Sequence, residues 1–158
     1  MAGTNWSFMS RMIALPACVA SLVFLLTAPM VNAREMVSVD RPKINMREGA
    51  GKEFDAVWSL EKGYPLQVTG RRGNWLKVRD FENDRGWVYR PLVDKTPHYV
   101  VKAAVANIRR APSGSARIVG RAEKGEVLRT LGHRNGWVQV APESGANGWV
   151  ARRLLWGW

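Results

Sequence analysis

The chain repeats itself at an offset of 62 residues, and this duplication constrains the fold more than any other feature. Without a gap, residues 39–92 match residues 101–154 at 17 positions, whereas unrelated sequences of ordinary composition would share about three. The matches include Asn-x-Arg at Asn45 and Asn107, Glu-Lys-Gly at residues 61–63 and 123–125, and Gly-Trp-Val at residues 86–88 and 148–150. The sequence therefore predicts one small folding unit present twice.

Each copy shows the alternation of β-strands and the punctuation of turns instead of helical periodicity. Alternating segments occur at residues 64–68 and 75–78, and again at residues 127–131 and 137–140. Gly73-Asn74 and Asn135-Gly136 are tight-turn dipeptides before the second segment of each copy. With the Gly-Trp-Val segments, these patterns predict about five short antiparallel strands per copy.

A unit of roughly sixty residues buries little apolar surface, so closing its sheet is an efficient way to hide the strand edges. We therefore predict an all-β chain of two tandem small β-barrels. The first domain is expected at residues 34–93, a short linker at 94–98 and the second domain at 99–158. The second domain ends in an apolar tail, residues 154–158, which we expect to pack against that domain. The alternatives are that the tail binds a partner or contacts the membrane interface.

The first 33 residues have the order of a signal peptide. An uncharged apolar run at residues 12–31 leads into Val31-Asn32-Ala33, small residues of the kind that a signal peptidase reads. We predict cleavage after Ala33, export to the periplasm or the extracellular space, and no stable membrane span in the mature chain. The alternative is an uncleaved helix that tethers the domains to the membrane, although Pro16 and Pro29 shorten its unbroken part.

The sequence offers little for catalytic or metal chemistry. Cys18 is the single cysteine and falls in the predicted signal peptide, so the mature chain would have no thiol nucleophile and no disulfide. His98, in the predicted linker, and His133, in a predicted turn, lack metal-ligand spacing and are interpreted as solvated surface. The Gly-x-Ser-x-Gly motif is absent. We predict a protein that is not an enzyme and needs neither metal nor cofactor.

The order of the motifs, from Asn-x-Arg through a Lys-Gly turn and Trp-x-x-Val to Gly-Trp-Val with Leu four residues on, occurs twice. This pattern resembles the bacterial Src-homology-3-like domain over nearly all of the mature chain. The opening motif is fuller at residues 107–112, because Ala50 replaces the proline found at Pro112. The resemblance implies an exported, non-catalytic module that binds peptidoglycan or its peptides. The alternative is an adaptor or scaffold that docks another envelope protein.

Alternation sorts the tryptophans into faces. Leu76 and Val78 share one face of their strand, so Trp75 shares the other face with Lys77. The same argument places four tryptophans on outer faces, namely Trp75, Trp87, Trp137 and Trp149. Two interpretations stay open: the rings seal the barrels beneath the loops at 47–56 and 109–118, or they line a groove for an extended peptide or sugar rings.

A resemblance to the eukaryotic relatives supports the groove, because it implies a ligand-contacting tryptophan at Trp75 and Trp137. Other predicted ligand-binding residues are the additional aromatics of the first copy, Tyr64, Phe81 and Tyr89, and three arginines of the second copy, Arg109, Arg110 and Arg134.

Charge distinguishes the copies within a formal net charge of +11. Residues 34–94 hold 12 basic and 10 acidic side chains, whereas residues 95–158 hold 11 basic and 3 acidic ones. The second copy is therefore expected to attract anions such as the carboxylates of wall peptides or an anionic envelope polymer, unless its charges are simply dispersed. Nucleic acid would fit the charge, but the predicted export argues against it.

Overall fold

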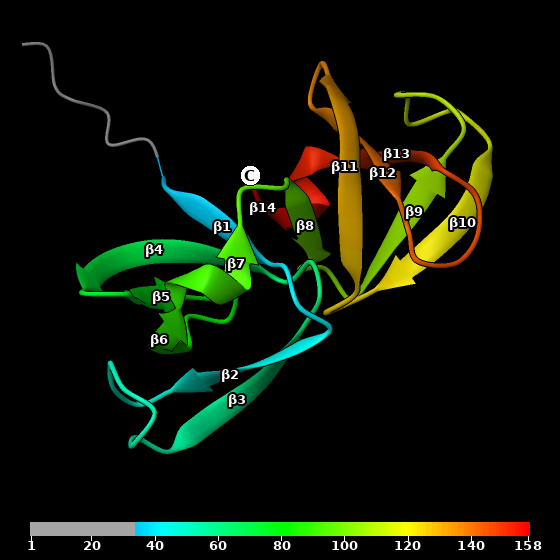
Figure 1. Ribbon diagram of the computed structural model, residues 1–158. Coiled ribbons are helices and arrows are strands. Elements are labelled where there is room, and N and C mark those ends of the chain that lie inside the picture. Colours follow the sequence, from blue (N-terminus) through cyan, green and yellow to red (C-terminus); the bar gives the residue numbers. More distant parts are fainter. Residues whose placement is uncertain (1–33) are drawn as a thin grey trace, which may run out of the picture. The chain divides into compact units, whose positions relative to one another are not determined.

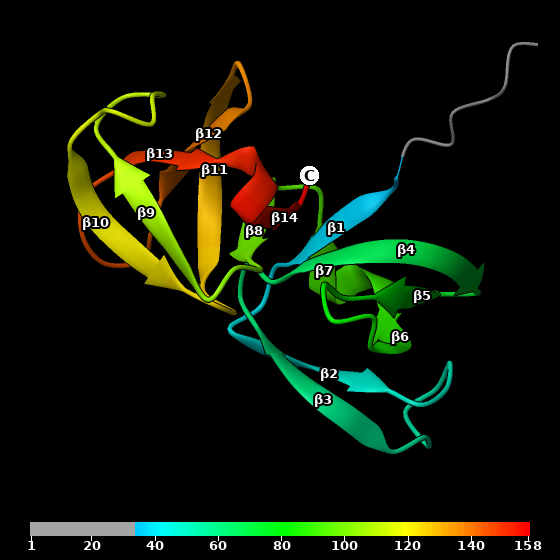
Figure 2. The same cartoon turned by 180° about the vertical axis from the view of Figure 1, so that it is seen from behind.

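The computed structural model describes residues 34–158, which form two antiparallel sheets of seven strands each (Figure 1, Figure 2). The predicted signal peptide, its cleavage site and the alternative membrane tether lie outside the described residues. Within the described part, no helix is long and apolar enough to cross a membrane. Residues 34–158 belong to one compact unit that contains both hydrophobic cores.

The first sheet has the strand order β3-β2-β6-β5-β4-β1-β7. Its elements are β1 (Met36–Val39), β2 (Lys43–Arg47), β3 (Ala56–Glu61), β4 (Pro65–Arg72), β5 (Trp75–Arg79), β6 (Arg85–Tyr89), the 3-10 helix η1 (Arg90–Leu92) and β7 (Val93–Asp94).

The second sheet repeats this order as β10-β9-β13-β12-β11-β8-β14. Its elements are β8 (His98–Val101), β9 (Val105–Arg109), β10 (Ile118–Glu123), β11 (Val127–Arg134), β12 (Trp137–Ala141), β13 (Gly148–Ala151), the 3-10 helix η2 (Arg152–Leu154) and β14 (Leu155–Gly157). The identical order in both sheets is the structural form of the sequence duplication.

The predicted all-β fold is confirmed, with more strands per copy than expected. The segments named from the sequence correspond to β4, β5 and β6 in the first copy and to β11, β12 and β13 in the second. All four residues of β1 are buried, so both of its faces are covered and it shows no apolar-polar alternation. A strand covered on both faces lacks the period-2 pattern by which strands are recognised in a sequence.

Each sheet encloses its own core. In the first copy, Met46 from β2 and Leu60 from β3 join Leu66 from β4 and Val39 from β1 in one cluster. Because these strands lie toward opposite ends of the sheet order, the sheet curls around its core. The second copy repeats this arrangement around Leu128 and Val138, which are both fully buried.

Bulges and tight turns fall at matching positions in the two copies. The register of β4 against β5 shifts between Val68 and Gly70, and that of β11 against β12 shifts between Thr130 and Gly132. Such bulges bend a strand and increase its twist. The turn before β12 has positive φ angles at both Asn135 (45°) and Gly136 (80°), which confirms the predicted Asn-Gly turn.

The two copies contact each other directly. Trp158 donates a hydrogen bond from its Nε1 to the Oγ of buried Ser38, at 3.3 Å. Leu155 is buried in the second core and Trp158 packs against that core, so the apolar tail packs back as expected. The predicted linker is shorter in the structure, because Asp94 belongs to β7 and His98 begins β8.

Candidate ligand-binding site

The outer face of β5 and β6 carries alternating aromatic and basic side chains. Leu76 and Val78 are buried, and Trp75 and Lys77, which alternate with them along β5, lie on the opposite face. Strand pairing sets Trp75 against Tyr89 and Lys77 against Trp87. The predicted outward orientation of these tryptophans agrees with this register.

The aromatic side chains on this face contact one another and a neighbouring arginine. The ring centroids of Trp75 and Tyr89 lie 5.3 Å apart with a tilt of 53°. The guanidinium of Arg72 lies 5.6 Å from the centroid of the Trp87 ring. Both tryptophans are half-buried, so each keeps part of its ring available to solvent.

A groove of about 270 Å³ opens beside this aromatic pair. The aromatic groove is lined by Lys43, Ile44, Asn45, Arg47, Lys52, Trp75, Tyr89 and Leu92. Arg47 is held in place by donating from Nη1 to the main-chain oxygen of Phe54 at 2.7 Å. Three cations and no carboxylate line the groove, which therefore suits an anionic or carboxylate-bearing ligand.

A second hollow of about 350 Å³ is lined by Gln67, Thr69, Lys77, Arg79 and Arg85. Arg79 donates to Gln67 Oε1 at 2.6 Å and to Asn83 Oδ1 at 2.7 Å, so its guanidinium is oriented on both sides. Here too three cations meet without a carboxylate among the lining residues. The first copy thus presents a basic outer face, although its net charge in the sequence is nearly balanced.

The second copy keeps this arrangement only in part. Strand pairing sets Trp137 against Ala151 and Arg134, and Trp149 against Gln139 and Arg109. Ala151 occupies the position that corresponds to Tyr89, so Trp137 has no aromatic partner across the strands.

The arginines predicted in the second copy separate into different surroundings. Arg109 and Arg134 lie beside the two tryptophans, and Arg109 donates from Nη1 to the Ala116 oxygen at 2.7 Å. Arg110 follows β9 and is exposed. The structure therefore brings two of the three predicted arginines to the face that carries Trp137 and Trp149.

Tyr64 and Phe81 lie away from the aromatic groove. Their ring centroids are 6.5 Å apart, and the Tyr64 hydroxyl donates to Asp80 Oδ2 at 3.3 Å. Burial raises the pKa of Tyr64 well above its ordinary value, and the neighbouring Asp80 carboxylate adds to this shift. These two predicted residues belong to a separate cluster at the loop between β5 and β6.

Both histidines lie in strands, which corrects their predicted placement in a linker and a turn. His98 begins β8, and His133 lies in β11 with its Nε2 3.0 Å from the Tyr99 hydroxyl. Burial raises the pKa of Tyr99, while Arg152, whose guanidinium lies 4.7 Å from the Tyr99 ring centroid, opposes the shift. Across residues 34–158, the structure holds no group of three or more His, Cys, Asp or Glu side chains able to bind a metal ion.

Six groove residues were not predicted from the sequence: apolar Ile44 and Leu92, and the four polar residues Lys43, Asn45, Arg47 and Lys52. Burial alternates in β2, where Ile44 and Met46 are buried and the residues between and beside them face outward. The same alternation argument that placed Trp75 could have placed Lys43, Asn45 and Arg47. Lys52 comes from the following loop, whose position no sequence periodicity reports.

Comparisons with known proteins agree with this architecture. The family model described as "Bacterial SH3 domain" matches residues 41–95 and 102–157. The Bacillus subtilis (strain 168) protein "Putative N-acetylmuramoyl-L-alanine amidase YrvJ" is 24% identical over 139 residues, covering 77% of this chain and 26% of that protein. A Haemophilus influenzae protein named "Uncharacterized protein" is 25% identical over 81 residues, covering 51% of this chain and 40% of that protein. The chain thus spans well under half the length of these curated relatives.

Among solved structures, NlpC2 from Trichomonas vaginalis is 13% identical with a TM-score of 0.36, covering 78% of this chain and 48% of that one. The family match covers β2 to β7 of the first sheet and β9 to β14 of the second. This chain belongs to the bacterial SH3 domain family, of which it carries two tandem copies.

Proposed function

We propose that the chain is an exported, non-catalytic module that binds a cell-envelope ligand, namely peptidoglycan or its peptides. The observation that carries this proposal is the aromatic groove, where Trp75 and Tyr89 form a wall beside Lys43, Arg47 and Lys52. The groove offers both apolar and cationic contacts to a ligand.

The groove chemistry suits wall material in two ways. The flat faces of Trp75 and Tyr89 can pack against sugar rings or an extended peptide with little loss of side-chain freedom. The three cations can pair with the carboxylates of a stem peptide, and charge-assisted hydrogen bonds are stronger than neutral ones. A ligand that combines sugar, peptide and carboxylate would use both parts of the groove.

Two further observations support an envelope ligand. One relative is named as an N-acetylmuramoyl-L-alanine amidase, and we extend to this chain the recognition of material that contains such a unit. The duplication presents two outer faces with tryptophans in equivalent strands. If both faces engage one polymer, the second contact is intramolecular and raises the overall affinity.

Cosedimentation of residues 34–158 with purified, protein-free peptidoglycan at two salt concentrations tests this proposal. We expect sedimentation at both, with partial loss at the higher salt because exposed ionic contacts are screened. Trp75→Ala should reduce binding, and Trp58→Ala is the matched control because Trp58 is 54% exposed on β3, outside the groove. Absence of sedimentation at both salt concentrations would overturn the proposal, as would equal losses in the two variants.

The alternative function, an adaptor for another envelope protein, has one specific observation in its favour. Strand β3 is an edge of the first sheet and carries exposed Val57 and Trp58, with exposed Phe54 just before it. Edge strands offer unpaired backbone groups to a partner strand. The adaptor would be favoured over the wall-binding module if the chain sediments with stripped wall only when an envelope protein is added. Trp58→Ala should then abolish this sedimentation.

A further inference from the structure

Where the two copies meet, the Glu-Lys-Gly turn of each approaches the loop before the Gly-Trp-Val strand of the other. On one side the contact is closed. Lys124, from the turn of the second copy, pairs with Glu82 of the first copy at 2.7 Å and lies 5.8 Å from the Phe81 ring centroid. On this side of the junction, Lys124 therefore has both an ionic and an aromatic partner.

The reciprocal side is open. Lys62 corresponds to Lys124 in the duplication, and Glu143 corresponds to Phe81. Instead of a closed contact, these residues line a pocket of about 530 Å³. Its lining comprises Pro42, Glu61 and Lys62 from the first copy and His98, Val127, Arg129, Ala141, Pro142 and Glu143 from the second. The volume falls in the range of small-ligand sites.

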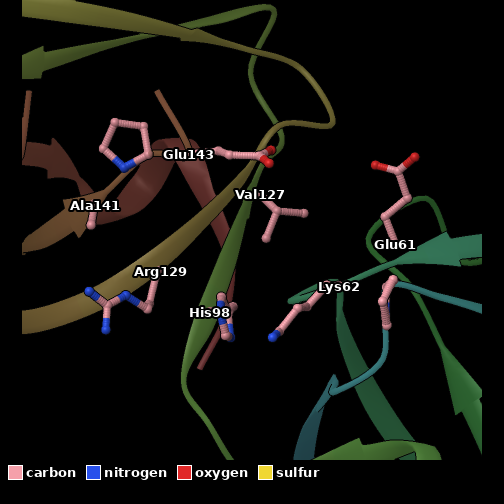
Figure 3. Close-up of a pocket in the computed structure, with 9 residues that line it drawn as sticks. Glu61, Lys62, His98, Val127, Arg129, Ala141 and Glu143 are labelled. Carbon is pink, nitrogen blue, oxygen red and sulfur yellow. The ribbon is translucent and has the colours of Figure 1, made fainter. Parts of the chain in front are cut away.

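The charged groups of this junction pocket are separated by sign. In Figure 3 the carboxylates of Glu61 and Glu143 lie in the upper part of the view, whereas Lys62 and Arg129 lie in the lower part. Among the described residues, no ion pair or side-chain hydrogen bond engages Glu61, Lys62, Arg129 or Glu143. Opposite charges therefore line one pocket without neutralising each other.

We propose that the junction pocket binds a zwitterionic peptide, with its ammonium group toward Glu61 and Glu143 and its carboxylate toward Lys62 and Arg129. An anion alone would meet the two glutamates, and a cation alone would meet the lysine and the arginine. A ligand that carries both charges satisfies both ends. Pro42, Val127 and Pro142 provide apolar surface for the segment between them. This site is separate from the aromatic groove and does not depend on wall binding there.

Titration of residues 34–158 with trialanine, followed by two-dimensional ¹H–¹⁵N NMR, tests this site. We expect shifts that cluster at Lys62, His98, Arg129 and Glu143. Acetylation of the peptide amine or amidation of its carboxylate should each weaken binding by about threefold or more, within the range of single exposed ionic contacts. Shifts located instead at Trp75 and Tyr89, or equal affinity for all three peptides, would overturn the proposal.

Charge-removing variants connect each end of the peptide to a side chain. Arg129→Gln should abolish the preference for the free carboxylate over the amide, and Glu143→Gln should abolish the preference for the free amine over the acetylated form. Both side chains are exposed, so the fold should tolerate the changes. Arg121→Gln is the matched control, because Arg121 is exposed on β10 and does not line the pocket.

The experiments distinguish a failure of the junction site from a failure of the proposed wall-binding function. Trp75→Ala should weaken wall binding and leave the affinity for trialanine unchanged. Unchanged peptide preferences in both Arg129→Gln and Glu143→Gln would reject the junction site while leaving wall binding intact. Formation of a direct Lys62–Glu143 ion pair in the free protein, detected as mutual shifts on mutating either residue, would also reject it.

Discussion

Trp75 and Tyr89 face each other across β5 and β6 with their ring centroids 5.3 Å apart. The corresponding pair in the second copy is Trp137 and Ala151. The two copies share a fold and a tryptophan, but only the first has the aromatic pair that walls the groove. This difference makes the first copy the stronger candidate for ligand binding.

Substituting the residues that face Trp75 and Trp137, namely Tyr89 and Ala151, should therefore change the affinity for peptidoglycan in opposite directions. Tyr89→Ala should weaken peptidoglycan binding by about two- to tenfold, the equivalent of one aromatic pair. Ala151→Tyr should strengthen binding, because it creates the missing pair beside Trp137. Cosedimentation isotherms measure both effects, and Trp58→Ala provides the baseline. If Tyr89→Ala binds as the wild type does, the first copy's aromatic wall is not the binding surface.

Core packing in the second copy should depend on Leu128 and not on Leu131. Leu128 is fully buried, whereas Leu131 is 41% exposed at the bulge of the same strand. Leu128→Ala should lower the free energy of unfolding by about 2–5 kcal/mol, and Leu131→Ala should change it by less than about 0.5 kcal/mol. Urea unfolding monitored by tryptophan fluorescence measures both. Similar losses in the two variants would contradict the assigned core.

The turn glycines provide a test of the contact between copies. Gly63 and Gly125 occupy equivalent turns with φ of 81° and 88°, so alanine should cost about 1 kcal/mol of strain at either. A Cβ at Gly63 would also lie 2.8 Å from Cδ2 of His98 in the other copy, while a Cβ at Gly125 meets nothing within 4 Å. Gly63→Ala should therefore destabilise more than Gly125→Ala in the same denaturation assay.

If the two glycine variants lose equal stability, the His98 ring does not pack on the Gly63 turn in solution. Comparing the pair removes the strain that both share, because each glycine has nearly the same backbone conformation. The difference then reports the contact between copies alone.

Asp80 should make the protein lose stability as the pH rises from acid. Burial raises the pKa of its carboxyl above the ordinary 3.8, and the backbone N–H groups of Asp84 and Glu82 oppose the shift only in part. From about that pH upward the unfolded chain releases the proton first, so the folded state binds more protons and the free energy of unfolding falls. The fall ends when Asp80 ionises in the folded state.

Asp80→Asn should remove this decrease, because the amide oxygen can still accept from the N–H groups of Glu82 and Asp84, which lie 2.9 Å from Oδ1. Urea unfolding at a series of pH values from about 3 to 7 measures the slope in both proteins. Identical slopes would assign the pH dependence to other carboxyl groups.

The duplication and the alternation of residues determined the architecture from sequence alone. Seventeen matches at a fixed offset required one unit twice, and period-2 alternation placed Leu76 and Val78 inside and Trp75 outside. These inferences hold because the side-chain direction in a strand follows from its backbone geometry. Strands β1 and β8 escaped prediction because both are almost entirely covered on two faces and show no alternation.

Only the tertiary structure decided which of the predicted residues act together. Tyr89 joins Trp75 in the groove, whereas Tyr64 and Phe81 form a separate cluster. Lys52 reaches the groove from a loop, and Lys62 and Glu143 line one pocket at the junction of the two copies. Such meetings depend on strand register, bulges and the packing of one copy on the other. These are long-range features that no local pattern of residues encodes, whereas the strands themselves follow from neighbours in the chain.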